Sequence, residues 1–240
     1  MRAKAGRFRQ APRTAQGQVR RKGPQQRKQR KTKGVGWPYP PPSAGFVASR
    51  HETSVPRVDP GTQSWNPGAM ERQQTDRVFV GNAGLVLLNP YLPHLFEHLG
   101  LVRQNDDSRP AIDPRGARLL QHVADGRWDA PEPELTLNKL LCGLDPATPV
   151  EAAAEPSPEE IDTCDDLLKA VRTNWPHLRN ASTDILRETF IQREGRLTFH
   201  EDRATLEVQR KTVDVLTDQI PWSFSVVFHR WMPAPIHVTW

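Results

Sequence analysis

The most restrictive feature of this chain is the uneven distribution of its charged residues. Of its 240 residues, the first 76 contain 16 Lys or Arg and 4 Asp or Glu, whereas residues 77–240 contain 17 and 24. Thirteen of the basic residues precede Gly34, with Gln, Gly and Pro between them and no acidic residue. Such a segment has too little apolar surface to offset the entropy lost on ordering. The sequence therefore predicts a disordered basic tail over residues 1–76 and one folded domain over residues 77–240.

The tail has several candidate roles. Its positive charge could hold a polyanion such as nucleic acid, an anionic lipid or an acidic protein surface. Residues 37–42, Trp-Pro-Tyr-Pro-Pro-Pro, favour polyproline II and could dock into an aromatic groove. A solvated tail without a ligand is the simpler alternative, and a translation start at Met70 would leave out residues 1–69. The acidic remainder does not suggest a nucleic-acid-binding domain.

In the folded part, prolines and glycines predict where helices begin and end. Pro93 precedes a helix that Gly100 stops, Pro114 begins one that Gly126 closes, and a helix that starts at Pro133 ends at Gly143. Proline suits the first turn of a helix, and glycine suits the position just after the last turn.

A linker rich in Ala, Pro and Glu over residues 144–157 precedes the clearest helix. Residues 157–160, Ser-Pro-Glu-Glu, form a capping box with Pro158 at the first helical position. Apolar residues then recur at spacings of three and four as far as Trp175, which predicts one buried helix face. A further helix is predicted to begin after Ser182 and to end at Gly195. Its charged residues are expected to form a solvent face with local ion pairs; they are Arg187, Glu188, Arg193 and Glu194.

After Gly195 the hydrophobic period changes from that of a helix to that of a strand. Leu197 and Phe199 alternate with polar residues, and Leu206 and Val208 do the same after a turn, which predicts a hairpin. A short helix over residues 212–219 and two strands over residues 224–228 and 236–240 complete the chain. The predicted fold is α+β, a mainly helical domain followed by a small antiparallel sheet.

One pattern raises the possibility of an enzyme. Residues 94–98 fit H-x-x-E-H, in which His94 and His98 could bind zinc and Glu97 could act as general base. No motif marks the third protein ligand that such a site needs. The alternative is a helix whose apolar residues are buried and whose histidines lie on or beside the solvent face. A zinc hydrolase is therefore a third hypothesis, and no catalytic residue, metal or other cofactor is predicted.

The cysteines and the hydropathy limit the class of protein further. Cys142 and Cys164 have no metal-ligand spacing and are predicted to be free, buried and inert thiols, as in a reducing compartment. No run of 18 apolar residues is present, so no membrane-spanning helix is predicted. The basic N-terminus lacks the apolar segment of a secretory signal.

The tryptophans near the C-terminus are the candidate partner-docking residues. Trp222, Trp231 and Trp240 could fill the core beneath the sheet, or they could form an exposed docking patch. Aromatic side chains of this size dominate binding energy where they face a partner.

Five strings of residues, taken in order, resemble one known family. They are residues 82–88 (Asn-Ala-Gly-Leu-Val-Leu-Leu, followed by Pro90 and Pro93), residues 137–143 (Leu-Asn-Lys-Leu-Leu-Cys-Gly), Trp175-Pro176, residues 186–195 (Leu-Arg-Glu-Thr-Phe-Ile-Gln-Arg-Glu-Gly) and residues 221–223 (Pro-Trp-Ser). From about Val78 to Trp240 the chain is similar to the contractile injection system tape measure proteins. These proteins belong to phage-tail-like particles that drive a tube through a membrane.

The resemblance implies a non-enzymatic assembly protein without a cofactor, incorporated into a particle in the cytoplasm. It implies a part in setting tube and sheath length and contact with the tube, the hub or spike, or the baseplate. The folded body is too short to act as a long ruler. No heptad run is present to form a long coiled coil, and a compact body of this size has a radius of gyration of about 15 Å. The tail could span about 250 Å when stretched. We therefore expect a docking module that binds through an aromatic-rich surface near Trp222 and Trp231, with polyanion binding by residues 1–33 as the alternative.

Overall fold

A computed structural model describes residues 36–37, 77–104, 109–151 and 154–240, all of which belong to one compact unit. Apart from Gly36 and Trp37, the predicted disordered tail lies outside the described residues, as do the candidate polyanion-binding residues 1–33 and the alternative start at Met70.

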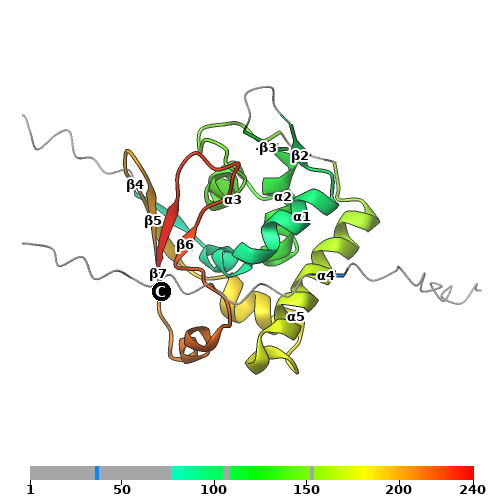
Figure 1. Ribbon diagram of the computed structural model, residues 1–240, viewed down its shortest axis with the longest axis vertical. Coiled ribbons are helices and arrows are strands. Elements are labelled where there is room, and N and C mark those ends of the chain that lie inside the picture. The colour runs from blue at the N-terminus through cyan, green and yellow to red at the C-terminus, as the bar shows by residue number, and fades with distance from the viewer. Residues whose placement is uncertain (1–35, 38–76, 105–108, 152–153) are drawn as a thin grey trace, which may run out of the picture. The chain divides into compact units, whose positions relative to one another are not determined.

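Helices make up most of the described chain before Gly195, as the prolines and glycines predict (Figure 1). A 3-10 helix η2 (Ala83–Tyr91) runs directly into α1 (Leu92–His98), which begins with Pro93 in its first turn. The following elements are α2 (Arg115–Asp125), the short η3 (Glu132–Leu135) and α3 (Thr136–Leu141). Gly126 and Gly143 end α2 and α3 with φ of 80° and 71°, which a residue with a side chain rarely adopts.

The longest helix, α4 (Pro158–Asn174), begins at the predicted capping box. The Ser157 hydroxyl accepts from the Glu160 amide at 3.2 Å, and the Glu160 carboxylate accepts from the Ser157 amide at 2.7 Å. The preceding segment, predicted as a linker, packs along the helices where it is described. Val150 is buried there, and its amide donates to Glu132 Oε1 at 2.8 Å.

The next helix is shorter than predicted. After η4 (Pro176–Leu178), α5 (Thr183–Leu186) continues into a π-helix, η5 (Arg187–Ile191), and the helix ends there rather than at Gly195. Gly195 is instead the first residue of a strand that pairs on both sides. A glycine that follows a helical pattern can end the helix or begin the next strand, and the sequence did not distinguish these two cases.

The five-stranded sheet has the order β1-β4-β5-β7-β6. Its strands are β1 (Arg77–Val80), β4 (Gly195–Phe199), β5 (Ala204–Val208), β6 (Val226–Val227) and β7 (Ile236–Thr239). The predicted hairpin is β4–β5, but the prediction of a purely antiparallel sheet is wrong because β5 and β7 are parallel. The helix η6 (Thr212–Gln219) and the chain after it form the long crossover that a parallel pair requires.

The edge strand β1 was also missed by sequence analysis. It precedes all the helices and pairs with β4, more than a hundred residues later, in the register Val78 to Leu197 and Val80 to Gly195. A separate two-stranded hairpin, β2 (Val102–Arg103) with β3 (Ala111–Ile112), was not predicted either. Both are too short to show a clear period of two.

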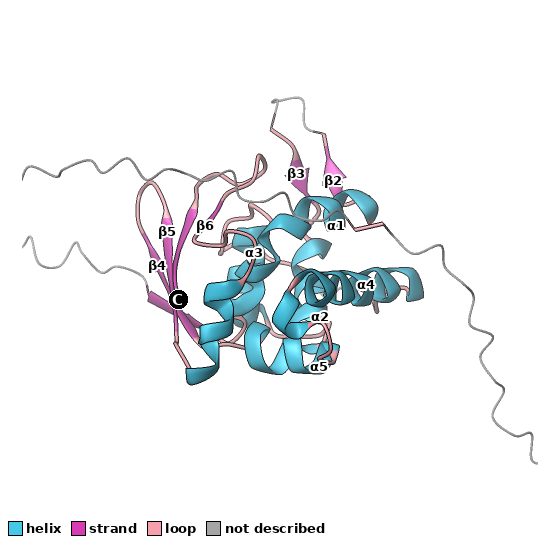
Figure 2. Cartoon of the chain, turned by 60° about the horizontal axis from the view of Figure 1, so that its bottom comes forward, coloured by secondary structure: helices cyan, strands magenta, loops and turns pink. Residues whose placement is uncertain are grey.

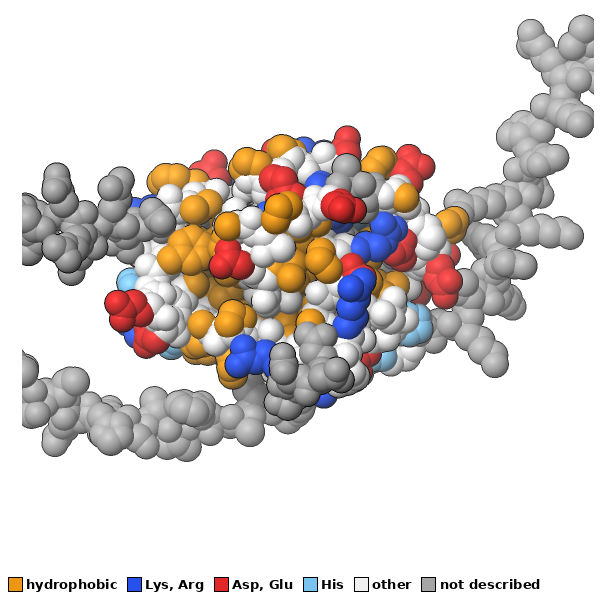
Figure 3. Space-filling view, turned by 90° about the horizontal axis from the view of Figure 1, so that it is seen from above, with side chains coloured by type: hydrophobic (Ala, Val, Ile, Leu, Met, Phe, Trp, Pro, Cys, Tyr) orange, Lys and Arg blue, Asp and Glu red, His pale blue; other side chains and the backbone are white. Residues whose placement is uncertain are grey.

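The helices cover one face of the sheet, as Figures 1 and 2 show. Residues on the inner face, such as Leu197, Leu206 and Ile236, are buried against them, whereas Glu207 and Thr239 on the outer face are exposed. On the face shown in Figure 3, apolar side chains lie among acidic and basic ones. The large hydrophobic residues with exposed side chains are Phe79, Ile185, Val215, Val226 and Phe228.

Candidate functional site

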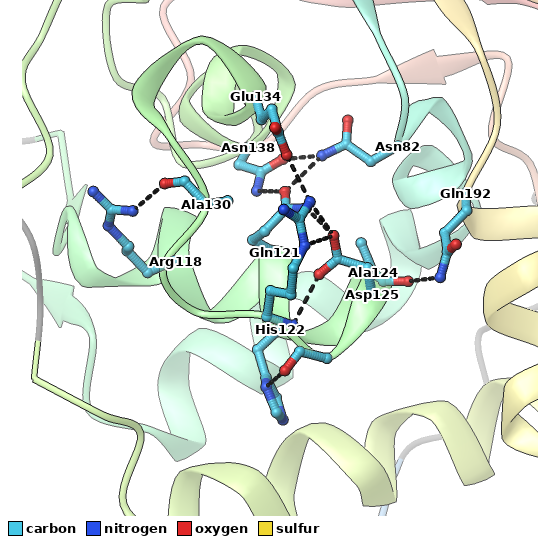
Figure 4. Close-up of polar contacts among 12 residues, drawn as sticks. Asn82, Arg118, Gln121, His122, Ala124, Asp125, Ala130, Glu134, Asn138 and Gln192 are labelled. Atoms are coloured by element: carbon cyan, nitrogen blue, oxygen red, sulfur yellow. Dashed lines mark hydrogen bonds and ion pairs between the residues drawn. The ribbon is translucent and has the colours of Figure 1, made fainter.

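Polar side chains from distant parts of the chain meet at the C-terminal half of α2 (Figure 4). Asn82, just after β1, donates through Nδ2 to Gln121 Oε1 at 3.0 Å and to Asn138 Oδ1 at 2.8 Å. Asn138 on α3 donates to Gln121 Oε1 at 3.0 Å and to the Ala117 carbonyl at 2.9 Å. All three side chains are buried, and buried amides are costly unless they are hydrogen-bonded. The cluster therefore fixes how β1, α2 and α3 lie against one another.

An ion-paired group extends this cluster to the surface. Gln121 Nε2 donates to Asp125 Oδ2 at 2.7 Å, and Arg127 Nε donates to the same oxygen at 2.9 Å. Arg127 Nη2 also reaches Glu134 Oε2 at 2.6 Å. The hydrogen bonds that Arg127 donates to Asp125 and Glu134 raise the pKa of Arg127 above its ordinary value. The cluster therefore consists of buried amides at its inner end and a half-exposed ion pair at its outer end.

A cavity of about 240 Å³ opens beside these residues. Its lining consists of Gly81, Asn82, Gln121, Ala124, Asp125, Arg127, Glu134 and Gln192. Asn82 Oδ1 is buried and has no hydrogen-bond partner among the described residues. The lining can hydrogen-bond a polar group, but it contains no nucleophile beside a general base.

The string over residues 186–195 holds the C-terminal end of α2. Arg187 Nε donates to the Val123 carbonyl at 3.0 Å, and Gln192 Nε2 donates to the Ala124 carbonyl at 3.1 Å. The last carbonyls of a helix have no hydrogen-bond partner within the helix. These side chains therefore supply donors to two carbonyls that would otherwise be unpaired. Figure 4 shows Gln192 reaching Ala124 from the neighbouring segment.

The prediction that Arg193 lies on a charged solvent face is wrong. Its side chain and that of Asp214 on η6 are both 0% exposed, and their two hydrogen bonds are 2.8 and 2.6 Å long. Arg193 also donates to the carbonyls of Thr189 and Gln209 at 3.0 and 2.6 Å. Local sequence spacing did not reveal this pair, because the partner lies 21 residues away on another element.

Two of the three candidate docking tryptophans belong to the core. Trp222 and Trp231 are each 4% exposed, and their indole N–H groups donate to the Leu87 and Leu141 carbonyls at 2.8 and 2.9 Å. Core packing is thus the arrangement that the structure shows for these two residues. Trp240 is partly buried, with its ring 5.5 Å from the Arg193 guanidinium. A contact with a partner stays a prediction for all three.

These contacts join the strings that were singled out in the sequence. Residues 82–88 contact residues 137–143 through Asn82, and they contact the Pro-Trp-Ser string through the Trp222 bond to Leu87. A family model described as contractile injection system tape measure protein matches residues 4–240. The chain belongs to this family. Neither a curated protein nor a solved structure matches this chain.

Tape measure proteins of contractile injection systems have a structural role in assembly and are not enzymes, which removes the zinc hydrolase hypothesis. In the structure the rings of His94 and His98 stack with centroids 6.0 Å apart, and Glu97 faces Arg230 at 3.5 Å. Among the described residues no group of three potential ligands gathers around a metal-sized space.

The cysteines of this tape measure protein are free and buried, as predicted. Burial raises the pKa of the Cys164 thiol to about 12 and raises that of Cys142 beyond the usual range, with a smaller contribution from Asp113 to Cys142. A thiol held in its protonated form is a poor nucleophile. None of the helices in the described ranges is long and apolar enough to cross a bilayer.

No motif or spacing in the sequence marks Asn82, Gln121 and Asn138 as a cluster. Asn82 comes directly before an apolar run that begins Ala-Gly-Leu-Val, and Asn138 lies in a string with three leucines. A polar amide at a position predicted to be buried is the signal that could have marked them.

Proposed function

We propose that the folded body is the docking module of this tape measure protein and attaches the chain to a tube, hub or baseplate component. The observation that supports this proposal is an apolar surface at the β6 edge of the sheet. Val226 is 45% exposed and Phe228 is 57% exposed, although both lie in the short segment between the buried Trp222 and Trp231. We call Phe224, Val226, Phe228 and Trp240 the β6 edge surface.

The β6 edge surface is supported by the core beneath it. Trp222 and Trp231 anchor the two ends of the segment through hydrogen bonds to the Leu87 and Leu141 carbonyls. Phe224 packs edge-on against Trp240 with ring centroids 5.7 Å apart. A surface held in place before binding loses less conformational entropy when a partner binds, and an aromatic anchor contributes most of the affinity. Trp222 and Trp231, which were predicted to dock, would then act mainly by positioning Phe228.

Docking also suits the dimensions of the body better than measuring does. The longest helix, α4, has 17 residues and so spans about 26 Å. The body therefore covers little length, and a ruler would have to come from residues 1–76 or from another chain.

The test compares two exposed phenylalanines at opposite edges of the sheet. Phe228→Ser removes an aromatic side chain from the β6 edge surface, and Phe79→Ser removes one from β1, where it is 79% exposed. Each full-length variant is expressed with the other particle genes, and its amount in purified particles is measured by quantitative mass spectrometry. We expect Phe228→Ser to reduce incorporation about tenfold, as for the loss of a binding anchor, and Phe79→Ser to leave it unchanged.

A salt series separates this proposal from attachment by the basic tail. Apolar docking persists as salt rises, whereas binding to a polyanion weakens steeply. Equal incorporation of both variants, or a loss of the wild-type chain from particles at high salt alone, would contradict docking through the β6 edge surface. Urea unfolding of both variants checks that the body remains folded.

A further inference from the structure

Trp37, in the predicted tail, lies against the body. Its ring centroid is 4.8 Å from that of His94, in an edge-on arrangement at 72°, and 6.4 Å from that of Tyr91. The side chain is partly buried and packs against the hydrophobic core. Gly36 and Trp37 are the short blue segment of Figure 1. The basic tail thus has one described point of contact with the body.

The side chains beside Trp37 are aromatic. Tyr91 is fully buried; its hydroxyl accepts from Asn174 Nδ2 at 3.0 Å and its ring meets Trp222 edge-on at 5.5 Å. The ring of His94 packs against Trp37, and the exposed His98 ring stacks on His94 with centroids 6.0 Å apart. We call Tyr91, His94 and His98 the aromatic socket.

Ring packing, rather than hydrogen bonding, holds Trp37 in the socket. Trp37 Nε1 and His94 Nε2 are both buried, and neither has a hydrogen-bond partner among the described residues. Trp222 and Trp231, in contrast, each donate to a backbone carbonyl of the core. A partly buried ring with an unpaired N–H is held less firmly than a core residue, so this contact can open without unfolding the body.

The sequence around Trp37 suits such a contact. Pro38 follows Trp37 directly, and the residue before a proline is restricted to extended conformations. Prolines at positions 40–42 favour polyproline II, and proline-rich segments typically dock into aromatic grooves. Trp37 is therefore presented by a stretch that loses little freedom on binding.

We propose that the aromatic socket is a binding site for a tryptophan followed by proline, and that its occupant is Trp37 of the same chain. The socket acts as a releasable attachment point for the tail. While Trp37 is bound, the chain is attached to the body at both Trp37 and Arg77, the residues that flank residues 38–76. Release of Trp37 adds these 39 residues to the reach of the tail, up to about 130 Å. In a tape measure protein such a difference in reach is a difference in measured length.

The experiment uses the full-length chain and a matched pair of tail variants, Trp37→Ala and Trp65→Ala. Aromatic side-chain resonances of Tyr91, His94 and His98 are followed by NMR, because an indole ring 4.8 Å away shifts the protons of His94. We expect Trp37→Ala to abolish that shift and Trp65→Ala to preserve it. A synthetic peptide of residues 33–43 should restore the shift in the Trp37→Ala chain, and the same peptide with Ala in place of Trp37 should not.

Several results would overturn the proposal. Unchanged His94 and Tyr91 resonances in the Trp37→Ala chain would show that the socket is empty in solution. Equal affinity of the peptide for the wild-type and Trp37→Ala chains would show that Trp37 does not occupy it. Loss of the shift on dilution of the wild-type chain would assign the occupant to a second copy. Because the socket and the β6 edge surface share no residue, failure of one proposal leaves the other testable.

Discussion

The buried pair of Arg193 and Asp214 is the residue-scale feature with the clearest energetic consequence. Both side chains are 0% exposed. Asp214→Asn keeps the shape of the side chain but leaves the Arg193 charge without a counter-ion. Breaking a buried ion pair in this way costs about 3–5 kcal/mol, so we expect the free energy of unfolding in urea to fall by that amount. The control is Asp218→Asn, which breaks an exposed pair with Arg210 and should cost less than about 1 kcal/mol.

The same pair makes the stability of the fold depend on pH in the acid range. Burial alone would raise the pKa of Asp214, but hydrogen bonds from Arg193 and the Lys211 amide, together with Trp240, bring it below the ordinary value. A lowered folded-state pKa stabilises the fold above the unfolded pKa of about 3.9. This stability is lost as pH falls through the folded pKa. The difference in unfolding free energy between wild type and Asp214→Asn should therefore shrink below about pH 4. A constant difference across the acid range would contradict the assignment.

At the scale of elements, the close approach of η2 to η5 depends on one glycine. A methyl group on Gly84 would overlap the Phe190 carbonyl oxygen and the Ile191 backbone, which no side-chain rotation can relieve. We expect Gly84→Ala to destabilise the fold by about 3 kcal/mol or more, or to prevent folding, because overpacking here must move backbone. Gly81→Ala is the matched control, since a methyl group there meets nothing within 4 Å. Thermal unfolding of both variants measures the difference, and similar melting temperatures would disprove this packing.

Local signals predicted the helices well and the sheet only in part. The capping box at Ser157 and the glycines after α2 and α3 act within a few residues, so their effect is visible in sequence. The position of β7 beside β5 and the pairing of β1 with β4 depend on contacts between distant segments. Arg193 shows the same limit, because its helical spacing placed it on a solvent face while Asp214 draws it into the core.

At the scale of the whole molecule, the family strings mark positions where segments meet. Gly143 lies against the Trp231 backbone, Gly195 against Ala83, and Asn82 against Asn138. The strings revealed the family from sequence, but they did not reveal the polar cluster or the socket. The cluster needs Gln121, which lies outside every string, and the socket needs Trp37 from the predicted tail. Neither site could be predicted from the sequence, because each combines residues from separate segments.

A last prediction concerns the independence of the body from the tail. A fragment beginning at Met70 retains all the helices and strands described here and loses only the described contact of Trp37 with the aromatic socket. Full burial of a large apolar side chain contributes about 1.5–3 kcal/mol, and Trp37 is only partly buried. We therefore expect the fragment to unfold cooperatively in urea, with a free energy lower than that of the full chain by about 1 kcal/mol. The full-length Trp37→Ala chain is the matched control and should lose the same amount. A fragment that is unfolded, or one far less stable than the Trp37→Ala chain, would mean that other residues before Met70 contribute to the core. Intact mass of the native protein would show which of the two forms is made.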